Sequence, residues 1–307
     1  MRVLILCTML LLAVPAVAFD FDLGKLDLNK IGNMVKHGQQ AFTDISEPEE
    51  IQIGGGMAAG LLGAAPLVKN QRVQRYVNDL GQWLAMHSER PGLPWRFGVL
   101  DTSDINAFAA PGGYVFITRG LFMSLWDEAE LAGVIGHEII HVLQKHHLQA
   151  IKARARAGLA TDALGMAADQ AGVQVEQFTR LGMDVYARGL DKEDEFEADR
   201  KGVVLAARGG YDPEGLPGVL YTINNMNPGS QGLSLMFQTH PPTGERIQRL
   251  EGLMDGRFLK AAAHQRLRKR LQAMQALLCR TAPAYSQGCE VCRFCRSKNL
   301  SRRACGI

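Results

Sequence analysis

The segment from Leu131 to Leu143 is apolar except for three side chains that can ionise, His137, Glu138 and His141. Its length and composition predict a helix that is buried on most sides. Burying two histidines and a carboxylate without partners would be costly, so the rest of the fold must satisfy them. The alternative is an ordinary surface helix with solvated histidines, and the apolar neighbours argue against it.

The spacing of these three residues suits a metal ion. Histidines four residues apart lie one above the other on a helix, so both imidazoles can reach one ion. Glu138 is rotated by about 100° and can reach a water on the ion rather than the ion itself. A catalytic zinc has three protein ligands and an open fourth position. We therefore predict one Zn²⁺ per chain, with His137 and His141 as ligands and Glu138 as general base.

The third ligand must come from elsewhere in the chain. Residues 191–199 open a later predicted helix with mostly charged side chains, which is also common for an ordinary helix start. Glu195 and Asp199 lie four residues apart, on one face, with Gly202 below them. A carboxylate on the metal, with a second carboxylate one turn on that holds a ligand histidine, is a usual arrangement. Glu195 is therefore the predicted third ligand.

The helix that carries the two histidines is predicted to be long. Ser124 or Asp127 can cap its start, and apolar residues continue to about Ile151. On a continuous helix His146 faces away from the predicted ligands. We therefore expect His146 and His147 to be solvated.

The remaining pattern is mainly helical, with a few early strands. Gly133 and Gly136 each lower helix propensity by about 1 kcal/mol relative to Ala, which indicates that another element packs closely there. The segment from Ile51 to Val68 contains five glycines and is predicted to be flexible or loosely helical. The fold class is therefore α+β with a small sheet. Strands are predicted at 95–100 and 114–118, and further helices at 67–87, 158–190, 191–208, 213–225, from 243, and at 257–278.

The first eighteen residues have the pattern of a signal peptide. Arg2 precedes an apolar run from Val3 to Val14, and Ala16 and Ala18 offer a small-x-small cleavage site. A buried N-terminal helix is the alternative. We expect export across an inner membrane to the periplasm, and a lipid anchor is not expected because Cys7 lies inside the apolar run. No later stretch is long and apolar enough to span a membrane.

The C-terminal part is basic and rich in cysteine. Twelve Lys and Arg residues and one acid, Glu290, follow residue 255, although the whole chain carries only +3. This tail either meets an anionic membrane surface or envelope protein, or docks on its own acidic body. All the cysteines after the predicted signal peptide lie here, and either disulfides or a zinc knuckle through 289, 292 and 295 would use them. They are Cys279, Cys289, Cys292, Cys295 and Cys305.

Motifs in a fixed order carry a family resemblance over roughly Leu67 to Leu250. The chain resembles the CAAX prenyl protease/HtpX/BepA-type family of gluzincin metallopeptidases, and in particular its secreted BepA-like branch. The resemblance implies a zincin-like metallopeptidase domain with a small sheet beside the His-Glu-x-x-His helix. The motifs are Asn106 to Gly113, Gly120-Leu121, His137-Glu138-x-x-His141, Glu195 to Asp199, and His240-Pro241-Pro242-Thr243-Gly244-Glu245-Arg246-Ile247.

The resemblance also implies roles for particular residues. It supports the same three zinc ligands and Glu138 as base, and it makes Asp199 either a proton donor or a support for a ligand histidine. Arg246 would pair with acids behind the site. His240 would be a fourth ligand that keeps the enzyme latent, a support for the oxyanion, or a loop histidine packed near Arg246. The strand Tyr114–Thr118 would be the edge along which an extended peptide lies.

These observations predict a zinc-dependent endopeptidase of the cell envelope that cleaves misfolded or unassembled envelope proteins. The alternatives are a zinc-containing chaperone or assembly factor with little proteolysis, and a surface-binding protein with a structural metal. No nucleic-acid partner is predicted. The predicted parts are a signal peptide (1–18), an N-terminal arm with the glycine-rich segment (19–66), the metallopeptidase domain (67–255), and the basic helix with the cysteine-rich tail (256–307).

Overall fold

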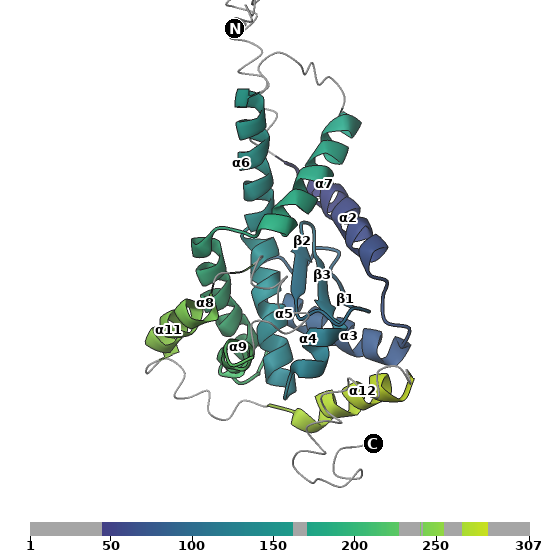
Figure 1. The fold of residues 1–307 in the computed structure, drawn as a ribbon, viewed down its shortest axis with the longest axis vertical. Helices are drawn as coiled ribbons and strands as arrows, with labels where there is room; N and C mark the ends of the chain where they lie inside the picture. Colours follow the sequence, from purple (N-terminus) through teal and green to yellow (C-terminus); the bar gives the residue numbers. More distant parts are fainter. Residues whose placement is uncertain (1–44, 162–170, 227–239, 241, 255–265, 282–307) are drawn as a thin grey trace, which may run out of the picture. The chain divides into compact units, whose positions relative to one another are not determined.

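The computed structural model describes residues 45–161, 171–226, 240, 242–254 and 266–281. The predicted signal peptide, most of the N-terminal arm and the last 26 residues of the chain (282–307) lie outside them. The described residues from Ser46 onward belong to one compact unit. It is mainly helical with one three-stranded sheet, so the predicted α+β class is confirmed (Figure 1).

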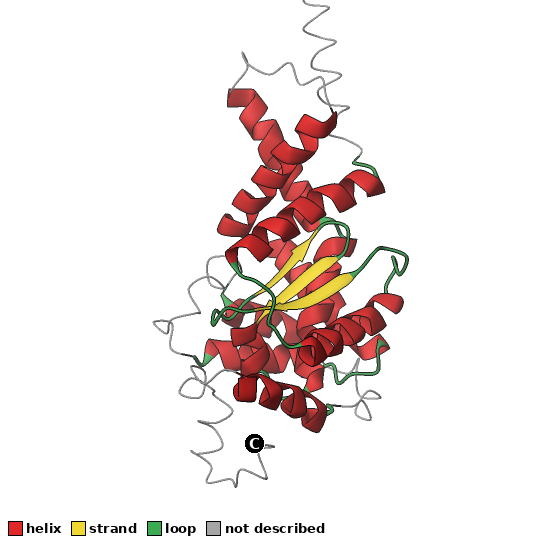
Figure 2. Ribbon diagram, turned by 90° about the vertical axis from the view of Figure 1, so that its right-hand side faces the viewer, coloured by secondary structure: helices red, strands yellow, loops and turns green. Residues whose placement is uncertain are grey.

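The sheet has the order β1-β3-β2, with β1 at Arg96–Leu100, β2 at Ala107–Ala110 and β3 at Tyr114–Thr118. β3 runs parallel to β1 and antiparallel to β2. The strands are buried almost throughout, and helices lie above and below the sheet in the view of Figure 2. β1 and β3 occur where they are predicted, whereas β2 consists of three alanines and a phenylalanine and lacks the β-branched residues that would have revealed it.

The position of β3 corrects one expectation. β3 is the central strand and is paired on both sides, so the prediction that 114–118 forms an open edge is wrong. The edge strand on the side of His137 and His141 is β2, which contacts the helix that carries these two histidines. Which strand lies at an edge depends on the order of pairing, and the composition of β3 does not encode that order.

The glycine-rich segment forms a regular helix, α2 (Glu47–Ala64), rather than a flexible stretch. Ser46 and Glu49 cap its start through a reciprocal pair of contacts. A Cβ added at Gly54 would lie 1.7 Å from the carbonyl oxygen of Pro111, in the turn between β2 and β3. The glycines therefore let α2 approach the sheet closely, and α2 also packs along α7 (Ala171–Arg188).

The long helix of the sequence is two helices. α5 (Glu128–Leu143) begins after Asp127, whose side chain accepts a hydrogen bond from the backbone N–H of Glu130. α6 (His146–Thr161) follows after a break at Lys145, which has a φ of 57°. The prediction of one helix to Ile151 is wrong because this left-handed residue turns the chain, as the C-terminal cap of a helix often does.

α8 (Lys192–Arg208) packs along α5 at two glycines. A Cβ added at Gly202 would lie 2.7 Å from the backbone nitrogen of His137, and one at Gly136 would lie 2.8 Å from the carbonyl oxygen of Gly202. A Cβ at Gly133 would lie 2.7 Å from the backbone nitrogen of Leu216. The predicted close packing at the glycines of α5 is confirmed. Shorter or outer elements are α3 (Gln71–Met86), α4 (Arg119–Ser124), α9 (Gly215–Asn224) and α11 (Thr243–Met254).

The C-terminal helix α12 (Arg268–Thr281) docks near the start of α5. The carbonyl oxygen of Arg266 accepts hydrogen bonds from the N–H groups of Glu128 and Ala129, at 2.9 and 3.3 Å. The Arg266 guanidinium lies 2.7 Å from Asp127, and Arg270 lies 3.1 Å from Glu128. The described part of the basic tail therefore docks on acidic groups of its own chain, one of the two alternatives left open by its charge.

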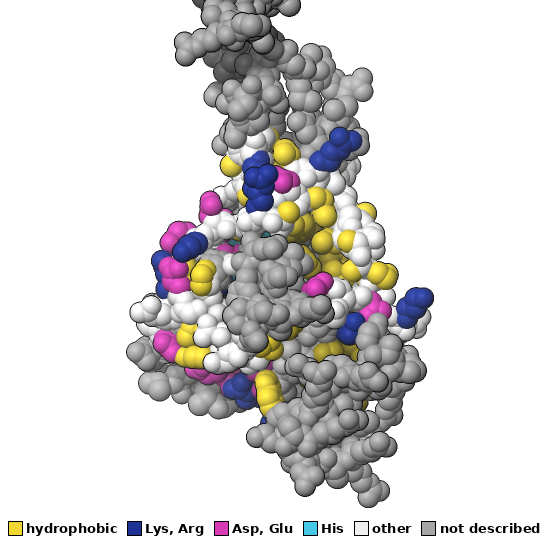
Figure 3. Space-filling model, in the orientation of Figure 1, with side chains coloured by type: hydrophobic (Ala, Val, Ile, Leu, Met, Phe, Trp, Pro, Cys, Tyr) yellow, Lys and Arg dark blue, Asp and Glu magenta, His cyan; other side chains and the backbone are white. Residues whose placement is uncertain are grey.

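Three further findings concern membrane-spanning helices, the surface and the tail cysteines. Within the described ranges, no helix is long and apolar enough to cross a membrane. Figure 3 shows hydrophobic side chains gathered beside α2 and α7, and charged side chains over α8 and α11. Cys279, on α12, is disulfide-bonded, and the other four tail cysteines lie outside the described residues.

Candidate metal centre

The three predicted ligands lie together. The Nε2 atoms of His137 and His141 are 3.0 Å apart, and each is 3.6 Å from an oxygen of Glu195. Ligands of a tetrahedral zinc at about 2.1 Å from the ion are about 3.4 Å from one another. The three side chains, two from α5 and one from the first turn of α8, are therefore spaced as the ligands of one ion would be.

Glu195 shows that these residues fit a cation. The carboxylate is fully buried, and its Oε1 is the one buried side-chain oxygen or nitrogen without a hydrogen-bond partner among the described residues. Burial alone would raise the pKa of Glu195, but the neighbouring His240 and His137 lower it to about 2. Burial lowers the pKa of His141 well below its usual value, so its ring is neutral and has a free lone pair. A buried anion beside the neutral imidazole of His141 is part of the donor set that a transition metal requires.

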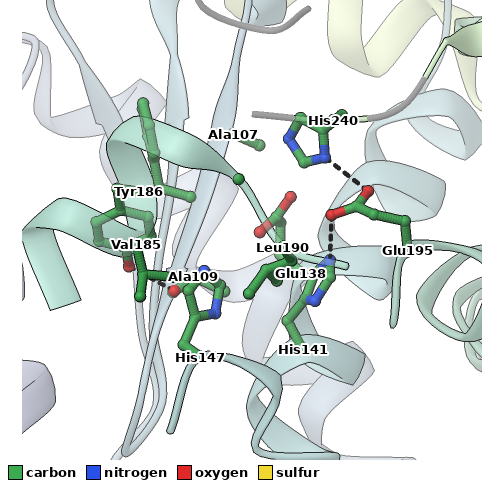
Figure 4. A pocket seen from close by; sticks show the side chains of 12 residues that line it. Ala107, Ala109, Glu138, His141, His147, Val185, Tyr186, Leu190, Glu195 and His240 are labelled. Carbon is green, nitrogen blue, oxygen red and sulfur yellow. Dashed lines mark hydrogen bonds and ion pairs between the residues drawn. The ribbon is translucent and has the colours of Figure 1, made fainter. Parts of the chain in front are cut away.

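Glu138 lies beside the proposed ligands, in the wall of a pocket (Figure 4). Burial raises the pKa of its carboxyl above the usual value. A carboxylate whose pKa is raised toward neutrality is a better proton acceptor at neutral pH. Its position beside the candidate ligands and its raised pKa agree with the predicted role of general base, which stays a prediction.

Asp199 and Arg246 lie behind His137. Oδ1 of Asp199 is 2.9 Å from Nδ1 of His137, the ring nitrogen that faces away from His141. Arg246 donates to both oxygens of Asp199, at 2.6 and 2.8 Å, so it pairs with an acid behind the site as predicted. Of the two roles considered for Asp199, this position supports the one in which it holds a ligand histidine.

His146 and His147 are buried, so the prediction that both are solvated is wrong. Nδ1 of His146 lies 2.9 Å from Nδ1 of His141. The rings of His147 and His141 are 5.6 Å apart and meet edge to face. The break at Lys145 turns α6 back toward the site, and a prediction based on one continuous helix could not place these two residues.

His240 reaches the site from the segment before α11. Its Nδ1 is 2.7 Å from Oε2 of Glu195. Ligand atoms of His137, Glu195 and His240 lie within 4.8 Å of one another, so these three residues form a second candidate set that overlaps the first. The ring is directed at Glu195 (Figure 4), and Nη1 of Arg246 lies 3.7 Å from the same Oε2, so His240 and Arg246 meet at one carboxylate oxygen.

The pocket extends from these residues to the edge of the sheet. β2 forms one wall, and Val185 and Tyr186 from α7 form another (Figure 4). The hydroxyl of Tyr186 donates a hydrogen bond to the carbonyl oxygen of Ala109. Sequence reasoning missed Tyr186, because nothing in its local pattern distinguishes it from a core residue. It named the alanines of β2 only as part of the family motif Asn106 to Gly113 and gave them no role in a pocket.

Comparison with known proteins agrees with this geometry. Residues 69–254, which contain all the candidate site residues, match peptidase family M48. The chain belongs to peptidase family M48. The M48 metallopeptidases are metal-dependent, and the family resemblance carried by the sequence motifs is confirmed.

Three relatives illustrate the match. The chain is 31% identical over 217 residues to the Beta-barrel assembly-enhancing protease of Escherichia coli K12, and the aligned region covers 68% of this chain and 45% of that protein. It is 32% identical over 164 residues to Metalloprotease YcaL of the same organism, with 52% and 62% covered. It is 26% identical over 219 residues to Mitochondrial metalloendopeptidase OMA1 of Arabidopsis thaliana, with 71% and 40% covered. The chain thus spans less than half the length of the first of these relatives. Their names support the predicted metalloendopeptidase class.

Proposed function

We propose that this chain is a zinc-dependent endopeptidase of the cell envelope that cleaves misfolded or unassembled envelope proteins. The observation that supports it best is the buried, unpartnered Oε1 of Glu195, 3.6 Å from Nε2 of His141. Export is supported by the signal-peptide pattern, and an envelope substrate by the name of the E. coli relative, which refers to β-barrel assembly. An anionic membrane surface or an envelope protein would engage the basic C-terminal tail.

The site residues divide the work of hydrolysis. His137, His141 and Glu195 would hold Zn²⁺, which when bound polarises the scissile carbonyl and makes its water acidic. Glu138 takes the proton of the attacking water and passes it to the leaving amine. Asp199 accepts a hydrogen bond from Nδ1–H of His137 and so directs the opposite nitrogen toward the metal.

An extended substrate would lie along β2 rather than β3. The carbonyl oxygen of Asn106 accepts a hydrogen bond from Thr118, so the backbone groups of alternate residues in β2 face β3. Those of Ala107 and Ala109 therefore face the open side, where a peptide strand can pair with them. The Tyr186 hydroxyl already occupies the Ala109 carbonyl, and Oδ1 of Asn106 accepts a hydrogen bond from the Ala107 N–H. A substrate would therefore pair first with the Ala107 carbonyl.

Metal removal tests the proposed function. We expect the purified chain to degrade casein or an unfolded envelope protein. A chelator should abolish cleavage, because the metal would be what activates the attacking water. Stoichiometric Zn²⁺ should restore the activity, and Mg²⁺, which prefers oxygen ligands, should not. Cleavage that persists in the metal-free protein would contradict the proposal. A protein that binds zinc but cuts no polypeptide would favour the assembly-factor alternative.

His240 is proposed as a fourth ligand that keeps the enzyme latent, because its ring is directed at Glu195 within ligand distance of His137. His240→Ala should then raise peptidase activity, since a closed site lacks a place for water. Initial rates on a quenched fluorescent peptide, normalised to bound zinc, measure the effect. A fall in rate at unchanged zinc content would instead assign His240 to oxyanion support.

A further inference from the structure

We propose that His146 is a positioning residue for the metal centre, which accepts a hydrogen bond from Nδ1–H of His141 and fixes that ring with Nε2 toward the ion. The inference rests on the proposed function, because it assumes that His141 is a ligand. It concerns a residue outside the candidate ligand sets. The contact that carries it is the 2.9 Å separation of the two Nδ1 atoms.

The contact exists because the chain turns sharply after α5. On an uninterrupted helix a residue five positions after His141 would be rotated by about 140° and displaced by about 7.5 Å, out of reach of its ring. The left-handed backbone of Lys145 replaces this path with a turn. Lys145 is itself held at 3.3 Å from Glu50, a fully buried residue of α2. The turn that delivers His146 is thus anchored to another element of the fold.

The protons of the pair can be assigned from the network. Nε2 of His141 faces His137 and Glu195 and must offer a lone pair to a metal, so its proton belongs on Nδ1. Nδ1 of His146 must then accept, which places the proton of His146 on Nε2. That nitrogen faces two carboxylates, 3.4 Å from Glu197 and 3.7 Å from Asp194. In this series of contacts, the hydrogen bond made by one ring determines which nitrogen of the next ring carries the proton.

The two proposed ligand histidines are therefore oriented by different groups. His137 donates to Asp199, an ionised carboxylate paired with Arg246. His141 donates to a buried imidazole, and the carboxylates lie one step further out, at partly exposed positions. Outer partners of this kind typically change metal affinity or activity by about 10–100-fold when they are removed.

Two substitutions separate positioning from mere filling of space. In His146→Asn the amide oxygen can take the place of Nδ1 and accept the same hydrogen bond. In His146→Leu the volume is largely kept and the acceptor is lost. His147→Leu is the matched control, because His147 is equally buried and touches the His141 ring only edge to face.

Zinc affinity, measured by competition with a chromophoric chelator, is the main readout. We expect His146→Leu to weaken binding by about 10–100-fold. His146→Asn and His147→Leu should stay within about threefold of the wild type. Equal weakening in the Leu and Asn variants at position 146, or equal effects at 146 and 147, would overturn the inference. If the wild type itself binds no zinc, the proposed function fails, which is a distinguishable result.

A second measurement needs no variant, so it stands even if a variant fails to fold. Long-range ¹H–¹⁵N NMR correlations on the zinc-loaded wild type report which ring nitrogen of each histidine carries a proton. We expect one buried histidine that is not a ligand to carry its proton on Nε2 and to accept on Nδ1 from a zinc-bound ring. A protonated Nδ1 on His146 would overturn the inference, because that nitrogen could not then accept.

Discussion

A Glu138→Gln variant is expected to keep its zinc and to lose about 100- to 10,000-fold of its peptidase activity, the range that general acid–base groups contribute. Gln has nearly the same shape as Glu but cannot take a proton from water. Glu138 lines the pocket beside the proposed ligands, and burial raises the pKa of its carboxyl. Loss of the proton acceptor, rather than loss of the metal, should therefore account for the defect.

The matched control is Glu130→Gln. Glu130 is also a buried glutamate of α5, but its carboxylate accepts from the backbone N–H of Trp126, at the far end of the helix from the site. Zinc content by mass spectrometry and initial rates on one peptide should be compared for both variants. We expect the Glu130 variant to stay within a few-fold of the wild type. A Glu138→Gln variant with the normal rate would remove Glu138 from the role of base.

Gly202→Ala is expected to lower the free energy of unfolding by about 1–3 kcal/mol, the usual effect of overpacking a close contact. The added Cβ would lie 2.7 Å from the backbone nitrogen of His137, so α5 and α8 would have to separate. Separation moves Glu195 away from the two histidines, and a shift of about 1 Å can reduce the rate about 100-fold. Stability and activity should therefore fall together, with weaker zinc binding.

Gly252→Ala supplies the same chemical change in open space. An added Cβ at Gly252, near the end of α11, meets no atom within 4 Å. Replacing an exposed helical glycine with alanine stabilises a protein by up to about 1 kcal/mol. Urea unfolding should show opposite signs for the change in stability of the two variants. Zinc titration should show weaker binding only in Gly202→Ala. If both variants behave alike, contact at Gly202 does not position Glu195.

Local geometry explains which predictions succeeded. The spacing of His137 and His141 places them on one helical face in any fold, because a helix repeats every 3.6 residues. The cap at Asp127 is equally local. Glu195 was found because a charged helix start contains a pair of carboxylates four residues apart, and family motifs in order singled out the same pair. The glycines of α5 showed that another helix approaches, although they did not show which one.

The sequence by itself therefore determined most of the helices, two of the three strands, the candidate ligands and the family, but not the break between α5 and α6. Tertiary structure alone decided that β3 is central, that the Arg266 carbonyl before α12 accepts from the start of α5, and that His146 reaches His141. Each of these depends on how segments far apart in the chain meet, or on one left-handed residue at Lys145 that carries no distinctive sequence signal. Local patterns fix the period of a helix or strand, whereas the direction of the chain after a turn is chosen by packing energy summed over the whole fold.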